Sequence, residues 1–169
     1  MKKIVVIFLV FLFVPLFACS SAIDVNGDKM INLNTFQVHI KGGEIHSIDT
    51  TIISSNQDIV DFLNNNNDRF IWHSDIQPSI NVFAEFLLNN YDDSFFKTNN
   101  LVLYGALKDI NNGIYYNIRD YQFENNNLNI NVDRLNPGGG RVIVYNMLIF
   151  EVSVDQNKLE SVNITVSDL

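Results

Sequence analysis

Apolar and polar residues alternate with a period of two in several segments of the chain, which is the pattern of half-buried β-strands. The alternation is clear at residues 36–40, and Gly42-Gly43 then supplies a two-residue turn typical of β-hairpins. The second half of the chain contains more strand-like segments, either alternating or continuously apolar: residues 101–107, 114–123, 128–132, 141–154 and 162–166. The segment 141–154 is long and mostly apolar, as in a central strand covered on both faces.

Between these strands the spacing of apolar residues lengthens to that of a helix. Residues 56–63 gather their apolar side chains on one helical face, with Ser55 or Asn56 as the N-cap. Residues 79–89 predict a second helix, and Pro78 suits its start. We therefore predict an α+β fold, a mostly antiparallel β-sheet with two helices packed on one face. It forms a single domain over residues 35–169.

The first residues of the chain have the layout of a bacterial export signal. Lys2 and Lys3 precede an apolar run over residues 4–17, and the small residue Ala18 follows. The run is shorter than the roughly 20 residues that a membrane-spanning helix needs. We predict that residues 1–18 are a signal peptide.

Cys19 is the only cysteine of the chain and directly follows the small residue, as in the lipobox of bacterial lipoproteins. The alternative is an ordinary secretory signal, because Phe17 is larger than the usual lipobox residue. In the lipoprotein interpretation Cys19 is acylated, and two acyl chains hold the protein on the extracytoplasmic face of the cell membrane. Residues 19–34 are small, polar and turn-rich, and we predict that they form the lipidated end and a flexible tether.

The charge of the chain narrows the choice of partners. The sequence has 19 acidic and 11 basic residues, a net charge of −8, and removal of residues 1–18 takes away two lysines and no acid. An acidic exported domain is poorly suited to bind nucleic acid, whose phosphates attract basic surfaces. With Cys19 lipidated, no thiol remains for a disulfide or a Cys-ligated metal.

The order of elements over residues 35–153 resembles an uncharacterised domain of clostridial and related Gram-positive lipoproteins. The matching segments are residues 52–59 (IISSNQDI), 86–96 (FLLNNYDDSFF), 100–103 (NLVL), 128–137 (LNINVDRLNP) and 148–152 (LIFEV). The strand-rich half is more distantly similar to the C-terminal domain of protease-complex-stabilising lipoproteins. The chain departs from the first family at residues 111–113, where Asn-Asn-Gly replaces a Gly-Ser-Gly turn. The resemblance implies a fold and a location, and no catalytic residues.

One pair of histidines suggests a metal site. If Gly42-Gly43 closes a hairpin with a returning strand at residues 44–48, His39 lies directly opposite His46. The two side chains could share a transition-metal ion if Glu44 supplied a third ligand. Two histidines on an exposed hairpin are more often ordinary polar-face residues, so both interpretations stay open.

Two further motifs have simpler explanations than the functions they suggest. Residues 24–35 resemble the start of a calcium-binding loop, but Lys29 stands where that loop needs glycine and Thr35 where it needs a carboxylate. His73 beside Asp75 could be a base with its orienting carboxylate. No serine of the chain lies in the G-x-S-x-G turn of hydrolases, so a surface loop is the better interpretation.

Other polar and aromatic residues are assigned to structure or to a binding face. We interpret Asp92-Asp93 as residues of a helix end and turn, and residues 138–140 as a flexible loop. Aromatic residues are concentrated in the strand-rich half, where exposed tyrosines could form a binding face. Tyr115 and Tyr121 are the candidates that we expect to be exposed.

These observations favour a lipid-anchored lipoprotein that binds a protein of the cell envelope or stabilises an envelope complex. The chain offers no convincing catalytic set, so we expect no enzymatic activity and no cofactor. The alternative is a small metal- or solute-binding lipoprotein that uses His39 and His46.

Overall fold

The computed structural model describes residues 20–23, 30–41, 48–71, 82–110, 113–138, 140, 142–153 and 159–169. Its helical elements are α1 (Asn56–Asn65), α2 (Val82–Asn90) and the short 3₁₀ helix η2 (Phe95–Lys97). Its strands are β1 (Ser20–Ile23), β2 (Met30–Ile40), β3 (Ile48–Ile53), β4 (Phe70–Ile71), β5 (Asn99–Asp109), β6 (Tyr115–Glu124), β7 (Asn127–Leu135), β8 (Val144–Ser153) and β9 (Ser161–Asp168).

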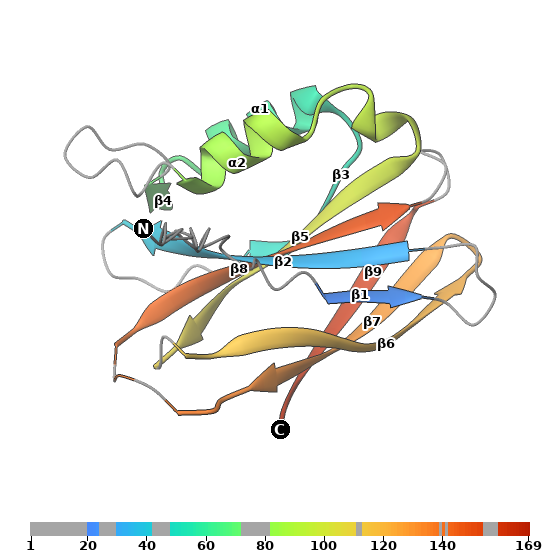
Figure 1. The fold of residues 1–169 in the computed structure, drawn as a ribbon. Coiled ribbons are helices and arrows are strands. Elements are labelled where there is room, and N and C mark those ends of the chain that lie inside the picture. The colour runs from blue at the N-terminus through green and yellow to red at the C-terminus, as the bar shows by residue number, and fades with distance from the viewer. Residues whose placement is uncertain are drawn as a thin grey trace, which may run out of the picture.

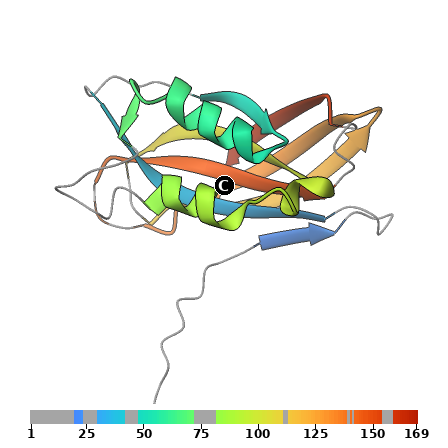
Figure 2. The same ribbon diagram turned by 90° about the horizontal axis from the view of Figure 1, so that it is seen from above.

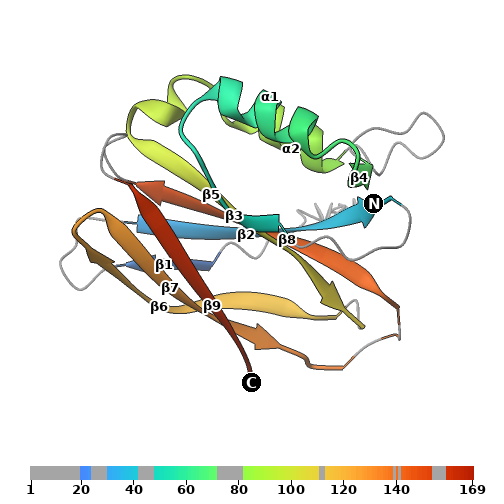
Figure 3. The same cartoon turned by 180° about the vertical axis from the view of Figure 1, so that it is seen from behind.

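The described elements form three layers (Figure 1). The middle layer is a six-stranded antiparallel sheet with the order β1-β2-β8-β5-β3, in which β4 also pairs with β2. Seen from above, α1 and α2 both cover the same face of this sheet (Figure 2). The opposite face packs on a three-stranded sheet, β6-β7-β9, in which β7 and β9 are parallel (Figure 3). The predicted α+β class, mostly antiparallel with two helices, is confirmed.

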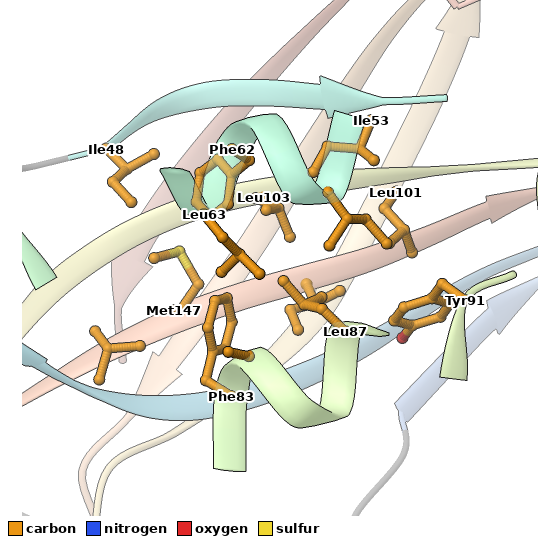
Figure 4. Packing of buried hydrophobic residues seen from close by; sticks show 14 of the residues in the cluster. Ile48, Ile53, Phe62, Leu63, Phe83, Leu87, Tyr91, Leu101, Leu103 and Met147 are labelled. Carbon is orange, nitrogen blue, oxygen red and sulfur yellow. The ribbon is translucent and has the colours of Figure 1, made fainter. Parts of the chain in front are cut away.

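The first core lies between the helices and the six-stranded sheet (Figure 4). Ser55 caps α1, because its Oγ accepts a hydrogen bond from the Asp58 backbone nitrogen at 3.1 Å. Asp58 in turn accepts a hydrogen bond from the Ser54 nitrogen at 2.9 Å, so the two side chains satisfy two otherwise unpaired donors. With its first turn held in this way, α1 buries Ile59 and Phe62 against the sheet.

The second core lies between the two sheets, and β8 contributes to both cores. Met147 and Ile149 face the helices, whereas Leu148 and Phe150 face the three-stranded sheet. All four side chains are fully buried. The sequence pattern of a strand covered on both faces is therefore confirmed, although β8 is shorter than the predicted segment 141–154.

The tether predicted for residues 19–34 is wrong for the part that the structure describes. β1 pairs with the first residues of β2, and Ile31 and Leu33 are buried in the second core. These two residues alternate with Asn32 and Asn34, so the strand period was present in a segment that composition alone suggested to be a loop. The folded domain therefore begins before residue 35.

The hairpin predicted across Gly42-Gly43 is also not the arrangement of the described strands. β8 and β5 lie between β2 and β3 in the sheet, and Ile48 pairs with Gly105 of β5. His39 instead lies opposite Ile71 of β4. The glycine pair indicates a turn, but a turn does not decide which strands become neighbours. β5 and β8 carry mostly buried apolar residues, and these two strands lie between β2 and β3.

Candidate binding site

A groove of about 670 Å³ lies beside the middle of β2, between the part of that strand that pairs with β1 and the part that pairs with β4. Its walls come from four parts of the fold: the middle of β2, the C-terminal end of α2 with the following turn, the end of β8, and the start of β6. The lining residues are Asn34, Thr35, Phe36, Phe86, Asn90, Tyr91, Phe95, Tyr115, Tyr116, Asn117 and Glu151. The groove is therefore mainly aromatic and amide-rich, with one carboxylate.

Glu151 is the charged group of the groove. Its Oε1 accepts hydrogen bonds from the Tyr91 hydroxyl at 2.7 Å and from Nδ2 of Asn34 at 3.1 Å. Its Oε2 accepts a weaker hydrogen bond from Nδ2 of Asn32 at 3.3 Å. Glu151 is half-buried, and three neutral donors offset the cost of removing its carboxylate from water. The described residues include no Lys, Arg or His in an ion pair with it.

Four aromatic rings follow one another along the groove. The ring centroids of Phe36 and Phe86 are 4.4 Å apart, those of Phe86 and Tyr91 are 5.6 Å apart, and those of Tyr91 and Phe95 are 4.8 Å apart. The interplanar angles are 40°, 81° and 60°, so the rings form a curved wall and not one flat stack. Figure 4 shows Tyr91 at the end of the helix core, just beyond α2.

The turn after α2 holds two of these rings in place. Oδ1 of Asp92 accepts hydrogen bonds from the Ser94 nitrogen at 2.9 Å and from the Phe95 nitrogen at 3.1 Å. It also accepts one from the Ser94 hydroxyl at 2.6 Å. These bonds, led by that of the Ser94 side chain, lower the pKa of Asp92 below its usual value. The interpretation of Asp92 as a helix-end and turn residue is therefore confirmed. The turn that Asp92 stabilises places the ring of Phe95 against the ring of Tyr91.

A second polar cluster lies close to the groove but inside the protein. Asp109 is fully buried, and its carboxylate accepts hydrogen bonds from the Tyr116 hydroxyl at 2.6 Å and from the side chains of Arg134 and Asn146. Arg134 also contacts Asp168 at 3.0 Å. Burial, and then the hydrogen bond to Asp109, raises the pKa of the Tyr116 hydroxyl. Asp109 and Asn146 belong to the six-stranded sheet, whereas Tyr116 and Arg134 belong to the three-stranded sheet. The cluster therefore joins the two sheets, and we assign it a structural role.

The two tyrosines proposed as a binding face have different positions. Tyr115 is 47% exposed and lines the groove, as that hypothesis requires. Tyr121 is only half-buried but packs against the core between the sheets, away from the groove lining. Tyr115 thus lies at the site, and Tyr121 is better explained by packing.

Sequence reasoning did not find Glu151 or the aromatic wall. Their segments were noted as family-like motifs, FLLNNYDDSFF and LIFEV, but nothing in the sequence showed that they meet. A signal was available for Glu151, since it is the one acidic residue in the apolar strand β8. A half-buried carboxylate in such a strand requires hydrogen-bond donors nearby.

Several candidate residues lie outside the described part of the chain. They are Cys19, the calcium-loop residues 24–29, Glu44, His46, His73 and Asp75. His39 is exposed on β2. Among the described residues, no three or more His, Cys, Asp or Glu side chains are grouped so that they could hold a metal ion. No described helix has the length and hydropathy to cross a membrane.

Fold and groove together define a three-layer α+β domain with an aromatic groove at a sheet edge. Comparison with known protein families, curated proteins and solved structures gives no match to this chain. The resemblance to the clostridial lipoprotein domain therefore stays a prediction.

Proposed function

We propose that the protein is a lipid-anchored extracytoplasmic module that binds another protein of the cell envelope and catalyses no reaction. The observation that carries this proposal is the groove beside Glu151. It combines exposed aromatic surface with amide groups and a carboxylate, the mixture that is enriched at protein-binding surfaces.

The predicted lipid anchor supports the same proposal. Ser20, the residue after Cys19, begins β1 and pairs with Leu33 of β2. Leu33 is followed by Asn34, which lines the groove. Since consecutive Cα atoms are about 3.8 Å apart, an acylated Cys19 would keep the groove close to the membrane surface. A partner bound there would be another protein at the membrane.

The alternative, a metal- or solute-binding lipoprotein that uses His39 and His46, has less support. His39 pairs with Ile71, an apolar residue that cannot ligate a metal. Titration of the wild type and of His39→Ala with Zn²⁺ tests this alternative. Binding in the micromolar range that disappears with His39→Ala would favour it over the protein-binding module.

The experiment that tests the main proposal is chemical cross-linking in native membranes followed by affinity purification of the protein. Tyr115→Ala removes an exposed ring from the groove, and Leu88→Ala removes an exposed apolar side chain of α2 that does not line it. We expect one specific envelope protein to be recovered with the wild type and Leu88→Ala, and to be lost with Tyr115→Ala.

The anchor is tested in the same experiment with Cys19→Ala. We expect this variant to leave the membrane fraction and to recover much less of the partner. Equal recovery with the wild type, Tyr115→Ala and Cys19→Ala would contradict both the groove and the anchor as parts of the function.

A further inference from the structure

We propose that the groove binds an extended peptide segment of the partner and receives a lysine or arginine side chain of that segment beside Glu151. This inference rests on the proposed protein-binding function and names the chemistry that the groove would recognise. It follows from the charge of Glu151, from the rings around it and from the edge of β2.

The first argument is the charge of Glu151. Its hydrogen-bond donors, Tyr91, Asn34 and Asn32, are all neutral. The arginines that form ion pairs in the described part of the chain are engaged elsewhere, Arg119 with Asp133 and Arg134 with Asp109 and Asp168. The described residues therefore position this carboxylate without neutralising it. A cation from outside would form a charge-assisted hydrogen bond with it.

The second argument is the aromatic wall formed by Phe36, Phe86, Tyr91 and Phe95. The face of an aromatic ring carries partial negative charge and attracts a cation within about 6 Å of its centre. Tyr91 is itself buried, so the accessible rings are the partly buried ones, Phe36, Phe86 and Phe95. The Tyr91 ring packs against Phe86 and Phe95 and its hydroxyl donates to Glu151, which places the carboxylate beside these rings. Rings around a carboxylate favour a side chain with a long apolar stem and a charged end, which describes lysine and arginine.

The third argument identifies the occupant as a peptide. β1 pairs with β2 at residues 30–33, and β4 pairs with it at residues 39 and 40. Between these two strands, residues 34–38 of β2 have no partner strand on the outer edge in the part of the chain that the structure describes. Residues 34–36 also line the groove. An extended peptide can add to such an edge through main-chain hydrogen bonds, with alternate side chains entering the adjacent pocket.

The net charge of the chain agrees with this assignment. At −8 the protein attracts basic segments over longer distances, and this attraction raises the association rate more than the final affinity. The groove then supplies the selectivity, because spread-out acidity alone does not distinguish one basic segment from another.

The test measures binding of a fluorescein-labelled peptide of alternating lysine and valine to the full-length protein in detergent, by fluorescence anisotropy. The comparison peptide has the same sequence with every lysine ε-acetylated, which removes the charge and keeps the stem. The protein variants are Glu151→Gln and the matched control Glu85→Gln, which removes the same charge from an exposed position of α2 outside the groove.

We expect the wild type and Glu85→Gln to bind the lysine peptide equally. Binding should weaken about tenfold for Glu151→Gln and for the acetylated peptide, which is the size of one charge-assisted contact. Phe95→Leu keeps an apolar side chain and removes one ring, so it should weaken binding severalfold while Glu151 is intact. Thermal unfolding of each variant excludes loss of fold as the cause.

Equal binding of the acetylated and unmodified peptides, or an equal loss in Glu151→Gln and Glu85→Gln, would overturn the inference. The proposed function would survive that result if the membrane partner were still recovered in a Tyr115-dependent way. Recovery of no partner would instead refute the proposed function itself, whatever the peptide result.

Discussion

The hydroxyl of Tyr116 donates a hydrogen bond of 2.6 Å to Oδ2 of Asp109, and both residues are buried. Asp109 is the last residue of β5, in the six-stranded sheet, and Tyr116 belongs to β6, in the three-stranded sheet. Arg134 of β7 compensates the charge of Asp109. The contact therefore joins the two sheets, and its loss should reduce the stability of the whole domain.

Tyr116→Phe is the first test of this contact, because it removes the hydroxyl and keeps the ring. A hydrogen bond to a charged group contributes about 1.5–3 kcal/mol, so we expect the free energy of unfolding to fall by that amount in urea denaturation. Tyr115→Phe is the control, since the neighbouring ring is exposed and should change stability very little. Equal stability of wild type and Tyr116→Phe would show that the hydroxyl contributes nothing.

The pH dependence of stability gives a second test of Tyr116. Burial and the hydrogen bond to Asp109 raise its pKa in the folded state, so the folded protein retains this proton when the unfolded chain has lost it. The stabilising contribution is complete below the unfolded tyrosine pKa of about 10 and decreases as the pH rises above that value. Urea denaturation from pH 8 to 11 should therefore show a steeper loss for the wild type than for Tyr116→Phe. Parallel curves would contradict the assignment.

Sequence periodicity was sufficient for most elements of this fold. Local spacing of residues, which a sequence displays directly, is enough to predict the alternation in β7 and β9 and the Ser55 cap of α1. The same holds for β8, which is apolar on both faces. The break between the strand-like segments 114–123 and 128–132 is a turn at Asn125-Asn126, where both residues have positive φ and asparagine tolerates it.

Strand partners and the groove could not be obtained in this way. A glycine pair after residue 41 indicates a turn, but it does not show which strands lie between β2 and β3. The start of β2 was missed because Asn32 and Asn34 resemble loop residues until Glu151 is known to accept their hydrogen bonds. Glu151 and Tyr91 are 60 positions apart, so only the folded chain brings them together.

Asn100 offers a test of a buried polar group with no evident use. It is fully buried on β5, and neither side-chain atom of its amide has a hydrogen-bond partner among the described residues. An unsatisfied buried group costs about 1–3 kcal/mol, so Asn100→Leu should raise the free energy of unfolding. Asn146→Leu is the matched control and should lower it, because the Asn146 amide donates to Asp109. Destabilisation by both substitutions would show that the Asn100 amide is satisfied in solution.

Gly105 pairs with Met147 of β8 at the start of a bulge in β5, and Leu107 pairs with the neighbouring β8 residue, Asn146. Its φ of +132° disfavours side chains, and a Cβ added there would lie 2.7 Å from the backbone oxygen of Asn146. Gly105→Ala therefore combines backbone strain with a clash against backbone that cannot move without opening the β5–β8 pair. We expect a loss of more than about 3 kcal/mol, beyond the range of strain alone, measured by urea denaturation.

Gly138→Ala separates these two causes. Gly138 also has a positive φ, +93°, but a Cβ added there would meet no atom within 4 Å. Its substitution should therefore cost only the strain, about 1 kcal/mol. Equal losses for Gly105→Ala and Gly138→Ala would show that the contact with Asn146 is relieved by movement of the strands. A much larger loss at Gly105 would show that β5 and β8, the two central strands, hold their spacing against an added methyl group.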